Sequence, residues 1–420
     1  MQRLRPQLAE ERGAGLSLGP NSAGELLQLF RTGEVATRGE LQRVTGLARS
    51  TVTFRIDALL EAGYLVEDGS IVDGRGRPST RLRVNDHLTT ILVADLGATH
   101  GRLAVGTPAG DVLVESVIES NIDRGPEAAL AMVRRKLDQL LKRSGRTRSS
   151  LRGAAIGVPG PVNRHTGRIA RSISMPGWDN YPVQDHLSDY FRVPAVVDND
   201  ANLMGLGEQR RVYPDAHQVL FIKVGTGIGA SVIIDGELLR GTDSAEGDIG
   251  HAKITGVEET CSSCGARGCL AAIASGRAMV RDLRRLGLEP STMRDVVQLV
   301  RAGNPDAVRV VTTAGRALGD VLSTAVSLLN PDIVVIGGDV VHAHERFMLG
   351  VRDTLLARTQ PLAIASLTIA PSALGDRAGI TGAAAMVADV IFGKAAVDAE
   401  INSSHPSASS AQGGTERATQ

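Results

Sequence analysis

Cysteine is scarce in this chain of 420 residues, which has only three, at positions 261, 264 and 269. So few cysteines, gathered in one place, argue against a disulfide framework and for a reducing, cytoplasmic setting. Long apolar runs are also missing: no stretch of 18 apolar residues occurs, so no membrane span is expected. The formal net charge is zero, so overall charge neither favours nor excludes nucleic acid as a partner. With 42% hydrophobic and 22% charged residues, the composition is that of a globular protein of two or three domains.

The three cysteines lie within nine residues, and a histidine stands ten residues before the first of them. Three thiolates and an imidazole are the ligand set of a closed, tetrahedral structural zinc site. Two glycines in the segment C-S-S-C-G-A-R-G-C allow a short loop to fold back on a metal. The alternative is three buried structural thiols and an unrelated histidine. The clustering favours Zn²⁺, with His251, Cys261, Cys264 and Cys269 as its ligands.

Residues 21–84 carry the apolar periodicity of three helices. The apolar positions, helix by helix, are Leu26, Leu27 and Phe30; Leu41 and Val44; and Val52, Ile56, Leu59 and Leu60. Thr37 is expected to cap the second helix, with Glu40 completing a capping box. Two short helices joined by the glycine-containing turn at 45–47 predict a helix-turn-helix. The segment 64–74 predicts a hairpin, the wing of a winged helix.

The third helix of this segment would contact DNA. Its outward positions are Arg49, Ser50, Thr51, Thr53 and Arg55. Small hydroxyl side chains allow close approach to the major groove, and arginine pairs with guanine edges or phosphates. Ala48 stands where a Ser or Thr N-cap is expected, which costs about 1 kcal/mol of capping. The alternative is an ordinary three-helix bundle, but the turn, capping box and wing favour binding of double-stranded DNA. We expect a homodimer or a dimer of dimers that binds an inverted repeat.

Arginine and glycine dominate the segment that follows the predicted wing. The sequence G-R-G-R-P at 74–78 resembles an AT-hook, in which Arg75 and Arg77 would enter a narrow A·T minor groove. The alternative is a solvated, positively charged linker. Both chain ends, residues 1–20 and 402–420, lack apolar periodicity and are expected to be disordered.

Two glycine-rich loops further along favour phosphate binding. The first, D-L-G-A-T at 95–99, follows a predicted strand and resembles the first phosphate loop of actin-like ATPases and sugar kinases. There Gly97 permits a tight turn, Thr99 can bind phosphate and Asp95 can hold a hydrated magnesium ion. The second offers backbone N–H groups to phosphates at Gly225, Thr226, Gly227 and Gly229. A buried strand ending at Gly337 and Gly338 is placed for an adenosine contact. Most such loops alone are turns; their order, with D-N-D-A-N at 198–202 between them, strengthens the interpretation.

The chain resembles the ROK family of bacterial sugar kinases and sugar-responsive transcription factors. The resemblance is carried by G-D-I-G-H at 247–251 and C-S-S-C-G-A-R-G-C-L at 261–270, with one residue more between the first two cysteines than is usual, and by G-V-P-G-P-V at 157–162 and M-P-G-W at 175–178. It implies an α/β fold, an actin-like two-lobed sugar-kinase domain at 90–395, joined to the winged helix at 21–84. Lobe one would span 90–203 with 382–393, and lobe two 204–381.

The same resemblance implies roles for cleft residues. In the kinases the aspartate matching Asp200 takes the proton from the sugar hydroxyl, and Asn199, Asp248 and His251 would also contact sugar. The alternative for Asp200 is a helix N-cap, and for Trp178 a core aromatic.

Two departures from the family pattern stand out. Asp248 replaces a usual glutamate, and Ala271 replaces another, which removes hydrogen bonds to sugar hydroxyls. We therefore expect a ligand other than plain glucose, such as a disaccharide or a sugar with an altered hydroxyl.

Three functions fit these patterns. The first is a DNA-binding transcriptional regulator, a repressor, that senses a sugar or sugar derivative. The second is an active sugar kinase, which would need ATP and Mg²⁺. The third is a regulator controlled by a protein partner. The helix-turn-helix favours the first and third, and nucleoid-associated, cytoplasmic action would follow.

Overall fold

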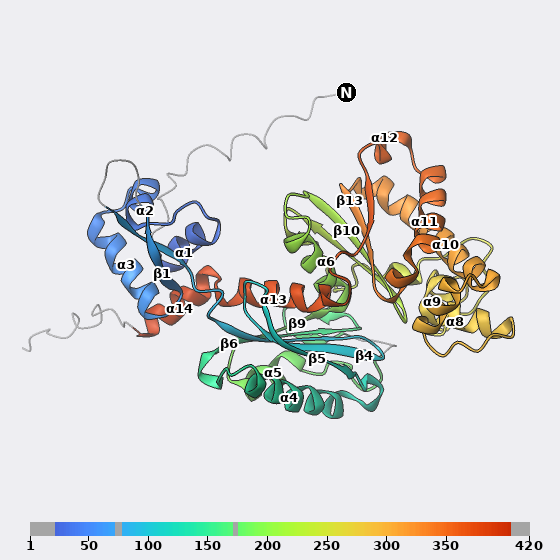
Figure 1. Ribbon diagram of the computed structural model, residues 1–420, viewed down its shortest axis with the longest axis horizontal. Helices are drawn as coiled ribbons and strands as arrows, with labels where there is room; N and C mark the ends of the chain where they lie inside the picture. Colours follow the sequence, from blue (N-terminus) through green and yellow to red (C-terminus); the bar gives the residue numbers. More distant parts are fainter. Residues whose placement is uncertain (1–21, 72–77, 171–174, 405–420) are drawn as a thin grey trace, which may run out of the picture. The chain divides into compact units, whose positions relative to one another are not determined.

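The computed structural model describes residues 22–71, 78–170 and 175–404, and the chain divides into two units (Figure 1). The smaller unit comprises the chain up to Asp86 together with the segment from Asp389 onward, and the larger one runs from His87 to Ala388. Arg75, Arg77, the expected arm at 1–20 and positions 405–420 of the expected tail lie outside the described residues.

Three helices form the body of the smaller unit: α1 (Ala23–Arg31), α2 (Arg38–Thr45) and α3 (Arg49–Glu61). Apolar side chains on α1 and α3 are buried as the periodicity predicts, including Leu26 and Ile56, neither of which is exposed at all. Two positions differ: Val44 is 56% exposed and Leu60 is only half-buried. Helix α2 is so short that Leu41 alone reaches the core, which leaves Val44 on the open side.

Helix capping in this unit follows the local sequence. The Thr37 hydroxyl accepts a hydrogen bond from the Glu40 backbone N–H at 3.1 Å, which confirms the predicted cap. The Glu40 carboxylate accepts from the Ala36 N–H at 2.7 Å, one residue before the Thr37 N–H that a capping box would use, so the predicted capping box is replaced by this neighbouring bond. Ala48 is the N-cap of α3 and supplies no side-chain hydrogen bond, also as predicted. The first turn of α3 therefore has backbone donors that no capping side chain satisfies.

The wing is a hairpin, but its second strand is not where the sequence placed it. Strand β1 (Leu65–Ile71) pairs antiparallel with β2 (Ser79–Val84), so the predicted hairpin within 64–74 is wrong. Gly69 has a φ of +77°, and the register shifts between Glu67 and Ser70. This bulge lets β1 continue through the middle of the predicted hairpin.

A C-terminal helix that the periodicity did not reveal, α14 (Lys394–Ser404), completes the smaller unit. The Asp398 carboxylate accepts from the backbone N–H of Gly24 at 2.8 Å, and Gln28 Nε2 donates to the Phe392 carbonyl at 2.8 Å. A Cβ on Gly24 would overlap the backbone of Lys394, so the two helices pack at close range. Residues 402–404, expected in the tail, are helical.

Two five-stranded sheets organise the larger unit, one in each lobe. The strands of the first are β3 (Thr90–Leu96), β4 (His100–Gly106), β5 (Val112–Glu119), β6 (Leu151–Val158) and β9 (Ala195–Asn199), in the order β5-β4-β3-β6-β9. Those of the second are β10 (Gln218–Val224), β11 (Ile228–Ile234), β12 (Glu237–Leu238), β13 (Ile333–Gly337) and β14 (Thr368–Pro371), in the order β12-β11-β10-β13-β14. In each sheet the first three strands are antiparallel and the last two join in parallel. The repeated connectivity confirms the expected two-lobed α/β fold.

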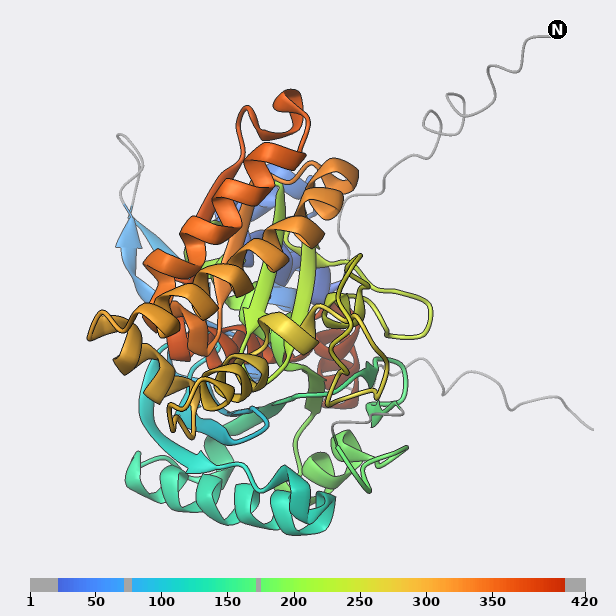
Figure 2. The same ribbon diagram turned by 90° about the vertical axis from the view of Figure 1, so that its right-hand side faces the viewer.

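Helices cover these sheets. Helix α4 (Pro126–Arg143) runs along one face of the first sheet, beside α5 (Val183–Phe191) (Figure 2). Trp178 lies in the same core, fully buried, and its indole Nε1 donates to the Ile122 carbonyl at 3.0 Å. Trp178 is therefore a core aromatic rather than a cleft residue.

The second sheet is backed by α10 (Pro305–Leu329) and α11 (His344–Arg358), which lie against each other (Figure 1, Figure 2). A Cβ on Gly319 would stand 2.6 Å from the Val351 carbonyl oxygen, so glycine permits this contact. The remaining elements are α6 (Asp200–Arg211), α7 (Ala271–Ala274), α8 (Gly276–Arg285), α9 (Met293–Arg301), α12 (Pro361–Ile364), α13 (Ala378–Ile391), β7 (Val162–Asn163) and β8 (Arg168–Ile169), with short 3₁₀ turns at Ile122–Arg124, Arg148–Ser150, Ile249–His251, Asp339–Ala343 and Gly375–Arg377.

Within the described ranges, no single helix combines the length and the apolar character that crossing a bilayer requires. One pair bent by 49°, Gly375–Ile391 with Lys394–Ser403, reaches the threshold by length and composition.

Candidate functional site

A pocket of about 580 Å³ opens in the larger unit, lined by loops from both lobes. All four residues predicted to contact sugar line it: Asn199, Asp200, Asp248 and His251. So do eight of the nine residues assigned to nucleotide: Asp95, Gly97, Thr99, Gly225, Thr226, Gly227, Gly229 and Gly338. The ninth, Gly337, does not; it is buried at the end of β13, where a Cβ would meet the Phe221 ring. The fold thus brings the separate motifs to one cavity of a size typical of small-molecule sites.

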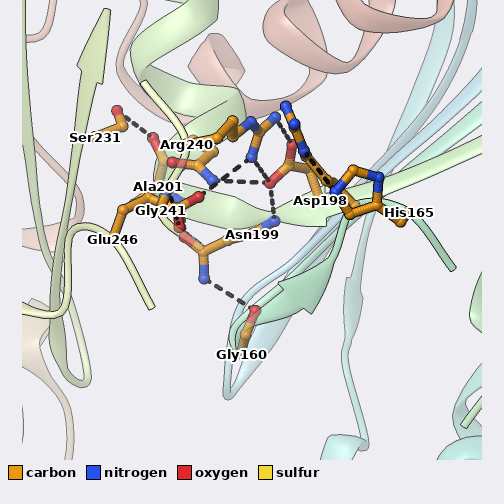
Figure 3. Close-up of polar contacts among 11 residues, drawn as sticks. Gly160, His165, Asp198, Asn199, Ala201, Ser231, Arg240, Gly241 and Glu246 are labelled. Atoms are coloured by element: carbon orange, nitrogen blue, oxygen red, sulfur yellow. Dashed lines mark hydrogen bonds and ion pairs between the residues drawn. The ribbon is translucent and has the colours of Figure 1, made fainter. Parts of the chain in front are cut away.

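Asn199 and Asp200 stand where β9 passes into α6. Asn199 is the N-cap: its Oδ1 accepts from the Ala201 N–H at 2.9 Å, and its Nδ2 donates to the Gly160 carbonyl at 3.1 Å (Figure 3). The capping role considered for Asp200 therefore belongs to Asn199. Asp200 is the first helical residue, only 4% exposed, and its carboxylate is bound by the ammonium group of Lys223.

An ion-pair network that the sequence did not reveal supports this turn (Figure 3). The buried carboxylate of Asp198 accepts from the Asn199 backbone N–H at 2.6 Å and from Asn202 Nδ2 at 2.8 Å. Both guanidinium NH groups of Arg240 also donate to it, one at 3.0 Å. The same guanidinium lies 3.5 Å from the carboxylate of Glu246, which lines the pocket. Arg240 thereby joins the start of α6 to the loop that precedes Asp248.

Asp95 lies at the end of β3 with little room around it. A Cβ on Gly157 would stand 3.0 Å from Asp95 Oδ1, and one on Gly379 would overlap the carboxylate. Its Oδ1 is buried and makes no hydrogen bond in the described structure. Burial raises the pKa of Asp95 to about 6, although the nearby Lys223 opposes that rise. The carboxylate is thus held at an energetic cost, which is typical of functional positions.

The predicted zinc ligands come together. The ligand atoms of His251, Cys261, Cys264 and Cys269 all lie within 4.8 Å of one another. The Sγ atoms of Cys264 and Cys269 are 3.6 Å apart, and Cys261 Sγ is 3.8 Å from His251 Nδ1. A tetrahedral site with Zn–S bonds of about 2.3 Å puts its sulfur atoms about 3.8 Å apart. The four donors therefore fit Zn²⁺ in both chemistry and spacing.

Lys253 adds a second layer to this cluster. Its ammonium group donates to Cys269 Sγ at 3.3 Å and to the Arg267 carbonyl. Three thiolates leave a Zn²⁺ centre with excess negative charge, which the ammonium offsets. Gly265 and Gly268 have φ of +73° and +77°, and these left-handed positions close the loop. His251 is shared: one ring nitrogen faces the cysteines, and the other lies 3.9 Å from Asp248 Oδ1.

The outer face of α3 carries the residues predicted to contact DNA. Arg49, Ser50 and Thr53 are exposed, whereas Thr51 and Arg55 are half-buried. Sequence reasoning missed Phe54, which is 60% exposed, with the Arg55 guanidinium carbon 5.9 Å from its ring centroid. An exposed phenylalanine beside polar side chains could have been noticed as a partner for a thymine methyl group.

Comparison with known proteins agrees with this architecture. The model of the ROK family matches residues 91–390. The xylose repressor of Caldicellulosiruptor bescii is 27% identical over 376 residues, which cover 86% of this chain and 94% of the repressor. That alignment is longer than the matched segment, so it extends into the smaller unit. A glucokinase of Halalkalibacterium halodurans is 29% identical over 303 residues, 69% of this chain and 92% of the kinase.

A solved structure shows the same fold. It is that of a ROK family transcriptional regulator described as a homologue of the Escherichia coli Mlc protein, with a TM-score of 0.74 and 24% identity. The superposition covers 90% of this chain and 98% of that one. With the cleft motifs in place and the family model matching most of its length, this chain belongs to the ROK family.

Proposed function

We propose that this chain is a transcriptional repressor that binds operator DNA through its smaller unit and a sugar or sugar derivative in the cleft of its larger unit. One observation carries the proposal: a helix-turn-helix with an exposed, polar third helix shares a chain with a cleft lined by both glycine-rich loops, Asn199 and Asp200. Xylose repressors and Mlc are similar over 84–88% of the chain, which supports the combination.

The polar wall of the cleft defines the class of effector. Asn199, Asp200, Asp248 and His251 offer carboxylate, amide and imidazole groups to hydroxyls. Ala271 also lines the cleft, where it offers only a methyl group. A sugar that lacks or masks the hydroxyl facing Ala271 loses nothing there, whereas one presenting it leaves that hydroxyl unpaired. Such a sugar relieves repression only by binding the DNA-free state more tightly than the DNA-bound state.

On the DNA side, one helix-turn-helix contacts only a few base pairs. A homodimer or a dimer of dimers would place two α3 helices about 34–36 Å or a multiple apart on an inverted repeat. Arg49, Ser50, Thr51, Thr53 and Arg55 would contact bases or phosphates, and Arg75 and Arg77 would contact an adjoining minor groove. This action would take place at the nucleoid.

Structural zinc belongs to the same proposal. With four protein ligands the site is closed, so the metal would stabilise the loop at 251–269 rather than take part in chemistry. His251 lines the cleft while facing the cysteines, so zinc would also hold one effector contact in place.

The test combines mapping of genomic binding sites with fluorescence anisotropy on the operator found. Sugars linked to the neighbouring genes are titrated against the complex. We expect an inverted-repeat operator and release by one sugar class. Absence of sequence-specific DNA binding by the full-length chain overturns the proposal, as does indifference of the complex to every sugar tested.

A sugar kinase is the second candidate, because glucokinase relatives reach 29% identity and both glycine loops with Asp200 are present. It would use ATP and Mg²⁺, with Asp200 as base and Asp95 toward the metal. We expect no sugar-dependent ATP turnover. Turnover at ordinary enzymatic rates of roughly 1–10³ s⁻¹ would make the kinase the main function.

A further inference from the structure

Lys223 lines the cleft and directly precedes the second glycine-rich loop, whose backbone N–H groups were expected to bind phosphates. It is the next-to-last residue of β10, and its side chain is 21% exposed. Its partners across the sheet are Gly229 on β11 and Gly337 on β13. Because directly opposite residues project to the same face, neither neighbour adds a side chain beside Lys223, although the Phe221 ring fills the space next to Gly337. The long lysine side chain therefore has space to reach the start of α6.

Three carboxylates surround its ammonium group. Asp200 binds it directly, and Asp95 and Asp339 act on it electrostatically. Burial alone lowers the pKa of Lys223, but these carboxylates raise it above its ordinary value. Lys223 is thus a permanent cation at neutral pH. Its charge is the largest influence that favours the ionised form of the buried Asp95 carboxylate, whose Oδ1 makes no hydrogen bond in the described structure.

This arrangement does not fit the magnesium-bound nucleotide that the kinase resemblance implies. A cation fixed among Asp95, Asp200 and Asp339 repels a second, divalent cation approaching the same oxygens. An Asp200 carboxylate already bound to an ammonium group is also a weaker base, since protonation would break the ion pair. Neither effect hinders a neutral sugar, which meets the cleft through hydroxyl groups.

We propose that Lys223 is a tethered cation that takes the place of a divalent metal ion in this cleft, so that a sugar binds there without magnesium and is not phosphorylated. The proposal rests on the proposed function in that the cleft is taken to bind a sugar. On this proposal Lys223, together with Asp248 and Ala271, separates a sensing cleft from a phosphorylating one. It also accounts for the presence of Asp95 and Asp200 together in a repressor, because each has Lys223 as its counter-charge.

The opposing interpretation is that Lys223 contacts nucleotide phosphates. The two interpretations predict opposite effects of replacing Lys223. If Lys223 replaces a metal, Lys223→Met exposes the carboxylates and creates a divalent-cation site. If it binds phosphate, the same change weakens binding of ATP and creates no such site.

The experiment is a Mn²⁺ titration of the full-length chain followed by electron paramagnetic resonance. It compares the wild type, Lys223→Met, Lys223→Met with Asp95→Asn, and Lys142→Met, which removes an exposed lysine from α4 as the matched control. We expect Lys223→Met to bind about one Mn²⁺ per chain at least roughly tenfold more tightly than the wild type and the control, since about one pKa unit of interaction corresponds to that factor. Adding Asp95→Asn should remove the gain.

A second measurement covers the case in which Lys223→Met does not fold, as judged by thermal unfolding. ATP binding to the wild type is titrated by calorimetry with and without Mg²⁺. ATP binding that is absent, or equal with and without Mg²⁺, supports the proposal. Tight ATP binding that depends on Mg²⁺ overturns it. The proposal is also overturned if a folded Lys223→Met variant binds Mn²⁺ no more tightly than the wild type. Operator release by sugars is measured on the same wild-type sample, so that failure of the proposed function can be told apart from failure of this inference. If sugars do not release the operator, the proposed function is wrong, whereas the Mn²⁺ result still decides the role of Lys223.

Discussion

The guanidinium of Arg240 binds the buried carboxylate of Asp198 at two points, directly beside the helix start that carries Asn199 and Asp200. Removing one partner of such a pair leaves the other charge buried, which typically costs about 3–5 kcal/mol. We expect Arg240→Met to lower the free energy of unfolding of the larger unit by that amount, measured by urea denaturation. Arg240→Lys keeps the charge and should lose less. Equal losses in the two variants would show that fork geometry, not charge, matters here.

The buried carboxyl of Asp95 makes the stability of the larger unit depend on pH. In the folded state the pKa of Asp95 is about 6, above the ordinary value of 3.8 for this side chain, so the native state binds an extra proton between these values. The stability that comes from this extra proton on Asp95 is therefore fully present below about pH 4 and is lost as the pH rises through 6. Relative to wild type, Asp95→Asn should gain up to about 3 kcal/mol at pH 7 and lose that advantage near pH 4. Paired unfolding curves across this range test it; a pH-independent difference contradicts it.

Interactions between neighbouring residues could be predicted from the sequence, whereas contacts between residues distant in sequence could not. Thr37 and Ala48 were predicted as capping positions because an N-cap depends on the next three residues alone. Lys223 and Arg240 meet aspartates 23 and 42 residues away, and which residues meet at such separations is decided by the crossover of the sheets. Lys223 directly precedes the second glycine-rich loop, but nothing local to it or to Arg240 indicates which carboxylate the side chain meets.

The misplaced wing strand and the missed helix have similar causes. A hairpin confined to 64–74 would turn near Gly69, but a bulge accommodates the positive φ of this glycine within a strand. Helix α14 is rich in alanine and small polar residues, and only Val397 and Ile401 are buried on one face. Two apolar positions give too weak a period to recognise. What holds α14 is its contact with α1, between residues separated by 374 positions, such as Gly24 and Asp398.

We predict that removing one of the four proposed zinc ligands lowers the zinc content and the stability together. Cys264→Ser removes one of four ligands, and because zinc affinity contributes to folding, the melting temperature should fall together with the zinc content. Ser262→Ala, an exposed neighbour in the same loop, is the matched control. Atomic spectroscopy and thermal unfolding are measured on the same preparations. Unchanged zinc stoichiometry in Cys264→Ser contradicts the assignment.

The uncapped start of α3 offers a test on the DNA-binding side. Ala48→Ser supplies the missing side-chain acceptor and should stabilise the smaller unit by about 0.5–1 kcal/mol. Arg49→Ala, one residue further, should instead weaken operator binding by about 1–3 kcal/mol if it pairs with a base. Anisotropy on operator and scrambled DNA distinguishes the roles: equal weakening on both sequences would mean that Arg49 contacts phosphate only.

Asp200 provides the sharpest test of how the cleft and the DNA-binding unit divide their work. Asp200→Asn keeps the shape of the side chain but removes the negative charge that binds Lys223 and would accept hydrogen bonds from the sugar. Charge-assisted hydrogen bonds contribute about 1.5–3 kcal/mol each, so effector affinity should fall roughly 10- to 150-fold. Operator affinity without sugar should stay unchanged, because Asp200 belongs to the larger unit and α3 to the smaller one. Calorimetry with the effector and anisotropy with the operator measure the two quantities separately. If Asp200→Asn loses operator binding in the absence of sugar while remaining folded, the separation of sensing from DNA recognition is wrong.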